Sequence, residues 1–196
     1  MPTPLGHSLA GIAVAIAGQR GRPPRHPRRF LASPTTLICV ALATFPDVDL
    51  LVPGLHRTVT HSVTATIVVT IVAAAMTARA TTRRSGTRGA LSRIEWSAVV
   101  VYAAAYGSHI LLDWLGRDPS KLPGIQALWP FSDRRFISGW DIFPDEERRH
   151  IFTVPAMVRN LNVIAWELGI LGPVVIALWW LRQTPSRTTE VAAPRE

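Results

Sequence analysis

The apolar residues of this chain are gathered into five runs, separated by polar or arginine-rich segments. Three runs are long and cover residues 59–78, 96–112 and 168–181. Each is about long enough to cross a bilayer, or nearly so with its flanks, because a spanning helix needs about 20 apolar residues. Two shorter runs, residues 8–18 and 35–45, precede them. We expect these two to be short spans, re-entrant segments or helices buried by the longer ones.

This pattern predicts an all-α protein, a polytopic bundle of membrane helices with a long outer loop over residues 116–159. Composition agrees, since 48% of the 196 residues are hydrophobic and 17% are charged. A chain of this length fits one domain. We therefore predict a single integral membrane domain over residues 1–182 and a disordered cytoplasmic tail over 183–196. No Lys or Arg precedes the first run, which argues against a signal peptide.

The arginines predict which side of the membrane each segment faces. The net charge of +8 comes almost wholly from arginine. Residues 19–30 and 79–93 hold arginines and no acid, and the tail begins with Arg182. Short basic loops stay in the cytoplasm. If all five runs cross a cytoplasmic (inner) membrane, the N-terminus, residues 46–57 and the long loop lie on the extracytoplasmic side. Because topology explains the basic segments, we expect no nucleic-acid partner.

Histidines and aspartates lie at the outer ends of these runs. The stretch "HILLD" places His109 and Asp113 one helical turn apart, so both side chains can reach one ion. Asp113 is near a helix C-terminus, where the dipole disfavours an anion unless a cation is close. In "FPDVD", Asp47 and Asp49 would face one pocket if the backbone were extended. The predicted metal ligands are His7, Asp47, His56, His61, His109 and Asp113.

Structural alternatives exist for some of these residues when each is taken alone. His7 would fit a hydrogen-bonded structural histidine, and Asp47 and Asp49 would fit turn or capping residues. For His109 and Asp113, metal binding is favoured over a structural role, because ionisable groups near membrane depth are costly and indicate function.

Imidazole and carboxylate together suit zinc, manganese or iron, and the histidine content favours zinc, with one or two ions bound. Such an ion activates water and polarises a phosphoryl or acyl oxygen. Asp49 is the candidate for orienting or deprotonating the attacking water. Arg57 is the candidate for neutralising charge on a phosphoryl group. The loop stretch "LWPFSDRRF" supplies the predicted substrate-binding residues Trp129, Ser132, Arg134 and Arg135.

Five stretches occur in the order "GHSLAG", "FPDVD", "HRTVTHS", "HILLD" and "LWPFSDRRF". In this order they resemble the YdjM-like family of bacterial inner-membrane, metal-dependent hydrolases, over roughly residues 5–180. The resemblance implies an integral membrane protein with His and Asp metal ligands. It places the polar residues of the family on His7, Asp47, Asp49, His56, His61, His109 and Asp113.

Three functions fit these residues. The favoured one is a membrane-embedded metal-dependent hydrolase of a phospholipid or another lipid-linked phosphoester, with acyl esters less favoured. The second is a divalent-metal transporter. Transporters usually place polar residues near the midplane and often carry an internal repeat, whereas here the residues gather at one face without a visible repeat. The third is a non-catalytic scaffold with a structural metal. The predicted partners are the lipid bilayer and a lipid-like substrate.

Overall fold

The computed structural model describes residues 2–21, 23–24, 26–52, 56–85, 94–148 and 150–184. In chain order these form α1 (Pro4–Gly18), α2 (Pro27–Leu31), α3 (Pro34–Thr44), the 3-10 helix η1 (Phe45–Leu51), α4 (Val63–Ser85), α5 (Trp96–Leu115) and α6 (Val154–Gln183). Within these described residues, four stretches are long and apolar enough to cross a membrane: Pro34–Leu51, Val63–Thr81, Trp96–Leu115 and Val154–Gln183. The prediction of an all-α membrane bundle is confirmed.

Helix α6 begins at Val154, well before the apolar run over 168–181. The expected loop over residues 116–159 is therefore too long at its C-terminal end. Asn160 explains the difference, because it exchanges two hydrogen bonds of 2.8 and 2.9 Å with the backbone of Glu147. The loop thus satisfies a polar side chain in the early turns of α6, and a helix can form there despite the break in the apolar pattern.

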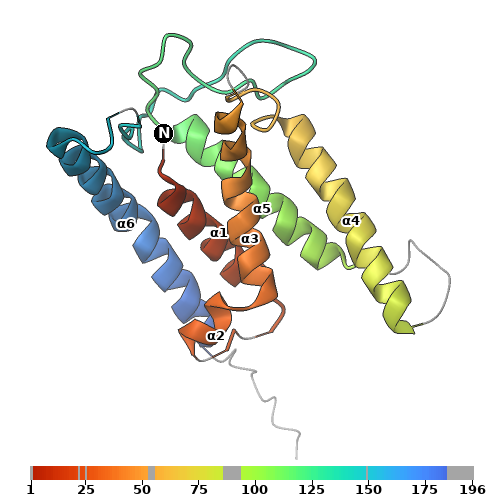
Figure 1. Ribbon diagram of the computed structural model, residues 1–196. Coiled ribbons are helices and arrows are strands. Elements are labelled where there is room, and N and C mark those ends of the chain that lie inside the picture. The colour runs from red at the N-terminus through yellow and green to blue at the C-terminus, as the bar shows by residue number, and fades with distance from the viewer. Residues whose placement is uncertain are drawn as a thin grey trace, which may run out of the picture.

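The short helix α1 packs against three others, α3, α5 and α6 (Figure 1). Small residues permit this close packing: a Cβ on Gly11 would lie 2.8 Å from the carbonyl oxygen of Cys39, and one on Gly18 would lie 2.1 Å from Cγ2 of Val101. Small residues commonly line helix contacts in membranes, where backbones approach closely. Of the three possibilities predicted for the first run, the structure shows a helix packed among longer ones.

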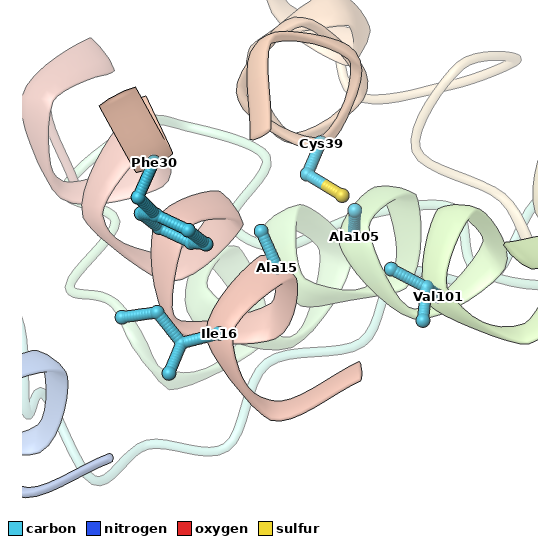
Figure 2. Packing of buried hydrophobic residues seen from close by; sticks show 6 residues of the cluster. All are labelled: Ala15, Ile16, Phe30, Cys39, Val101 and Ala105. Carbon is cyan, nitrogen blue, oxygen red and sulfur yellow. The ribbon is translucent and has the colours of Figure 1, made fainter. Parts of the chain in front are cut away.

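A buried apolar cluster joins α1, α2, α3 and α5 (Figure 2). Its members are Ala15, Ile16, Phe30, Cys39, Val101 and Ala105. The cluster ties the N-terminal helices to α5, and it holds the α1 and α5 backbones that carry polar residues further along. Cys39 is fully buried within it, which agrees with the expectation that this thiol is part of the core.

The two ends of the bundle differ in character (Figure 1). The N-terminus, η1 and the segment between α5 and α6 lie at one end, called the site end below. At the opposite end lie α2, with Arg28 and Arg29, and the last turn of α6, with Arg182. The predicted basic positions 22, 25 and 86–93, and residues 185–196 of the predicted tail, lie outside the described residues.

Candidate metal centre

A buried cluster of histidines and aspartates lies at the site end, where separate elements meet. Helix α1 supplies His7, η1 supplies Asp47, the turn before α4 supplies His61, and α5 supplies His109 and Asp113. The three histidines are fully buried, and Asp113 is 2% exposed. Burying so many ionisable groups is costly unless each has a partner of suitable charge.

The carboxylate of Asp113 is at the centre of this cluster. Its Oδ1 lies 3.4 Å from Nε2 of His7. Its Oδ2 lies 3.2 Å from Nε2 of His61 and 3.5 Å from Nε2 of His109. Oδ1 of Asp47 lies at the edge, 3.8 Å from Nε2 of His109 and 4.0 Å from Nε2 of His61. Three imidazole nitrogens and two carboxylates thus converge on one small volume.

Hydrogen bonds at Nδ1 determine which nitrogen of two rings faces the cluster. Nδ1 of His109 lies 2.7 Å from the carbonyl oxygen of Ala43, and Nδ1 of His61 lies 3.0 Å from Oδ2 of Asp49. Both partners are acceptors, so each Nδ1 carries the proton, and each ring has a lone pair on Nε2 when it is neutral. The two Nε2 atoms lie 3.0 Å apart. Two lone pairs at this distance repel each other unless a proton or a metal cation lies between them.

His7 adds a further unsatisfied ring to the cluster. It stacks on His109 with ring centroids 3.7 Å apart. Within the described part of the chain, neither ring nitrogen of His7 has a partner in hydrogen-bond geometry, and the same holds for Oδ2 of Asp113. Buried polar atoms without partners are rare. These atoms have the chemistry of metal ligands, and a metal ion would satisfy them.

Among the described residues, the ligand atoms form two adjoining groups. The atoms of His7, His109 and Asp113 lie within 4.8 Å of one another, and the same is true of Asp47, His56 and His61. Because Nε2 of His61 is also close to Asp113, the two groups adjoin. These groups could therefore hold a divalent metal, as the sequence predicted, and the expected number of one or two ions stays a prediction.

Asp49 lies behind His61, on the side away from the cluster. Its Oδ2 accepts hydrogen bonds from the backbone N–H of Arg57 at 2.9 Å and from Oγ1 of Thr60 at 2.7 Å, and it also faces Nδ1 of His61. Its Oδ1 faces Nδ1 of His56 at 2.9 Å. A carboxylate on the far nitrogen of a ligating histidine fixes the orientation of the ring. These contacts would suit a positioning role for Asp49, and the general-base role expected from the sequence stays a prediction.

The condition under which Asp47 and Asp49 would face one pocket is not met, because the backbone between them is not extended. Residues Phe45–Leu51 form a 3-10 helix. In such a helix, with three residues per turn, side chains two residues apart point in different directions. Asp47 therefore reaches the Nε2 side of His61, and Asp49 reaches its Nδ1 side.

Comparison with known families identifies the chain. The family model described as YdjM inner membrane protein matches residues 1–185. The chain belongs to this family. No curated protein and no solved structure matches it. Family membership and the four long apolar helices make it a multi-pass protein of the inner membrane, as the motifs and runs predicted.

Arg57 of this YdjM family member is ion-paired at the edge of the cluster. Its backbone has a positive φ of 64°, and its guanidinium forms an ion pair with Asp118. Asp118 also accepts hydrogen bonds from the backbone N–H groups of Ser120 at 3.0 Å and Gly124 at 2.7 Å. Burial opposes ionisation of Asp118, but the bond from Arg57 and these backbone bonds lower its pKa to about 2. Sequence reasoning missed Asp118, which lies in no motif.

The four predicted substrate-binding residues make different contacts in the YdjM family member. Arg135 lines a cavity that adjoins the cluster. Arg134 lies over the ring of Phe136, 5.6 Å from its centroid, and its backbone N–H donates to Oγ of Ser132 at 3.2 Å. The carbonyl oxygen of Trp129 accepts a hydrogen bond of 2.6 Å from the start of α4. Arg135 is thus the one of the four that adjoins the candidate metal centre.

Glu167 is a buried acid of α6 to which sequence reasoning gave no role. It accepts hydrogen bonds from the backbone N–H and the hydroxyl of Thr3, both at 2.5 Å. Thr3 is the N-cap of α1, where the helix dipole favours a negative charge. A Cβ on Gly6 would lie 2.9 Å from the Glu167 carboxylate. Glu167 therefore fixes the start of α1 next to His7. A lone acid within an apolar run is the signal that could have found it.

Proposed function

We propose that this YdjM family member is a membrane-embedded, metal-dependent hydrolase of a phospholipid or another lipid-linked phosphoester. The observation that carries the proposal is the approach of His61 and His109, whose Nε2 atoms lie 3.0 Å apart next to the buried Asp113 carboxylate. Nδ1 of each ring already has a hydrogen-bond acceptor, so the Nε2 lone pairs of the neutral rings face each other. A divalent cation would satisfy both rings and the carboxylate together.

The cluster has the nitrogen and oxygen donors that zinc prefers, with manganese and iron as alternatives. One ion would be held by His7, His61, His109 and Asp113, and a second by Asp47 and His56 with a shared ligand. A divalent ion at this place would lower the pKa of water and polarise a phosphoryl oxygen. The nearby arginines and the outer cavities favour a phosphoester over an acyl ester as substrate.

Three further residues have separate roles in the proposed reaction. Asp49 keeps Nδ1 of His61 protonated and holds the ring in place. Asp47 has a side chain that is 15% exposed and lines a cavity, so it replaces Asp49 as the candidate for orienting the attacking water. Arg57 lines a second cavity, where its positive charge would stabilise an anionic phosphoryl group.

The position of the cluster bears on the alternative functions. A transport site is expected near the midplane of the bundle. Here the cluster lies at one end, next to the loop between α5 and α6 (Figure 1). This position supports hydrolysis of a substrate at the membrane surface over transport across it. A scaffold with a structural metal remains the alternative that the experiment below separates.

Metal analysis and a substrate assay test the proposal. Purified wild-type protein should carry about one or two ions per chain, as mono- and binuclear hydrolytic sites do. The variants His109→Ala and Asp113→Asn should lose metal, whereas His150→Ala, an exposed histidine at the same end, should not. Wild-type protein should hydrolyse a member of a phospholipid panel, lose activity with a chelator and regain it with zinc.

Two results would contradict the proposal in different ways. Unchanged metal content in both His109→Ala and Asp113→Asn would show that the cluster is not the metal site. If metal-bound wild-type protein cleaved no phosphoester or acyl ester, the result would favour the non-catalytic scaffold with a structural metal.

A further inference from the structure

Two cavities adjoin each other at the site end. The loop cavity has a volume of about 690 Å³ and is lined in part by His56, Arg57 and the segment that follows α5. The η1–α6 cavity has a volume of about 520 Å³ and is lined in part by Asp47 and the end of η1. Leu50 and residues 146–148 line both. One elongated ligand could therefore lie in both cavities and pass the outer members of the metal centre.

The loop cavity is lined by four Lys or Arg side chains and four acids, so its charges balance, but two of the cations lie apart from the acids. Among the described residues, no carboxylate lies within ion-pair distance of Lys121 or Arg135, which both line it. The acids of the same wall lie close to cations: Asp118 to Arg57, Asp145 to Arg159, Glu146 to Arg148, and Glu147 to His150. The cations without an acid favour an anionic ligand, and a phosphate group suits an arginine and a lysine in this arrangement.

One side of the η1–α6 cavity is apolar and lies at the level where two candidate spans end or begin. Val48, Leu50 and Leu51 of η1 and Ile151 line it. Leu51 is 81% exposed. The cavity lies where the candidate span Pro34–Leu51 ends and the span Val154–Gln183 begins. Exposed apolar side chains at this level contact lipid, so the cavity is open to acyl chains from the side.

We propose that the two cavities together form a lateral-access site for one phospholipid of the bilayer. The phosphate and headgroup lie in the loop cavity near Lys121 and Arg135. The glycerol and the first part of the acyl chains lie in the η1–α6 cavity. The phosphoester then lies between His56 and Asp47, beside the candidate metal centre. This inference rests on the proposed function, because it names how the lipid substrate would reach the metal centre. Its test measures lipid binding and does not require hydrolysis.

Photo-crosslinking in vesicles tests the site with the full-length protein. One probe is a phosphatidylglycerol with a diazirine on the acyl chain close to the glycerol, and the matched probe is the diacylglycerol with the same chains and no phosphate. Labelled peptides are mapped by mass spectrometry. Peptides over residues 47–52 and 150–158 should be labelled about 10-fold more by the phospholipid, the factor expected from one charge-assisted contact. Helix α4, which is largely exposed to lipid, should be labelled equally by both probes.

Variants separate this site from general contact with the bilayer. In Lys121→Gln with Arg135→Gln, the preference for the phospholipid should fall to the value seen for α4. In Ile151→Trp, a larger side chain should fill the η1–α6 cavity and lower labelling of residues 47–52. Unchanged metal content in these variants shows that the fold is intact.

The outcomes distinguish this inference from the proposed function. Equal labelling of the cavity peptides by both probes would overturn the lipid site, whether or not the protein is a hydrolase. A phospholipid preference that persists in the Lys121→Gln, Arg135→Gln variant would overturn the placement of the headgroup. A clear preference in a protein without hydrolytic activity would support the lipid site and contradict the hydrolase.

Discussion

At the scale of single residues, Asp49 organises the turn between η1 and α4. Its two carboxylate oxygens contact His56, His61, the backbone of Arg57 and the hydroxyl of Thr60. One side chain thus sets the direction of two histidines and the path of the backbone between them. Because it fixes the far nitrogen of His61, its effect on the metal centre should be indirect.

The variant Asp49→Asn should weaken zinc binding by about 10- to 100-fold, the usual effect of removing a carboxylate behind a ligating histidine. The measurement is zinc affinity by competition with a chelator. Asp133→Asn, which changes an exposed acid of the outer loop, should bind zinc as the wild type does. If Asp49→Asn kept full zinc affinity but lost about 100-fold or more in turnover, the general-base role predicted from the sequence would be restored.

The ion pair between Arg57 and Asp118 should make stability depend on pH. The folded pKa of Asp118 is about 2, below its ordinary value of about 3.9, so the pair stabilises the fold fully above about pH 4. This contribution is lost as the pH falls from about 4 towards 2. At neutral pH, Asp118→Asn should lower the free energy of unfolding by about 1–3 kcal/mol, because it leaves a largely buried guanidinium without its carboxylate.

Thermal unfolding in detergent at neutral pH and at about pH 3 measures this difference. The gap between wild type and Asp118→Asn should narrow at the lower pH. If the difference in stability between wild type and Asp118→Asn were the same at both pH values, ionised Asp118 would not stabilise the fold.

At the scale of elements, α1 is the helix on which the centre most depends. It carries His7, it is held at its start by Glu167, and it packs among α3, α5 and α6. With 15 residues it is about 22 Å long, shorter than the hydrocarbon core of a bilayer. Its position is therefore set by contacts with other helices more than by the membrane.

Gly11→Ala tests this packing, because a Cβ there would lie 2.8 Å from the backbone carbonyl oxygen of Cys39. We expect a loss of about 1–3 kcal/mol in stability from overpacking, despite the better helix propensity of alanine. Gly169→Ala in α6 is the matched control, since nothing lies within 4 Å of its added Cβ. Thermal unfolding should show a loss for the first variant and none for the second. Equal shifts would mean that the contact between α1 and α3 relaxes freely.

At the scale of the whole molecule, the bundle has a basic end and a site end (Figure 1). The positive-inside rule predicts that the basic end faces the cytoplasm. A reporter that is active only outside the cytoplasm should therefore be active when fused after Pro123 and silent when fused at Ser85. The opposite result would place the candidate metal centre on the cytoplasmic face.

The sequence by itself determined the helical class, the membrane location, the family and the set of candidate ligands. These depend on local properties: the length of apolar runs, the positions of arginines, and short motifs such as "HILLD". The pairing of His109 with Asp113 was predictable for the same reason, because a helix fixes the distance between residues four apart.

Only the tertiary structure decided how these residues are arranged. Asp47 and Asp49 are two residues apart in sequence, but the 3-10 winding of η1 sends them to opposite nitrogens of His61. The pairing of Asp118 with Arg57 and of Glu167 with Thr3 was not predictable, since these contacts join residues 61 and 164 positions apart. These pairs are brought together by long-range packing of α1 against α6 and of the outer loop against the turn before α4. No local sequence pattern predicts such packing.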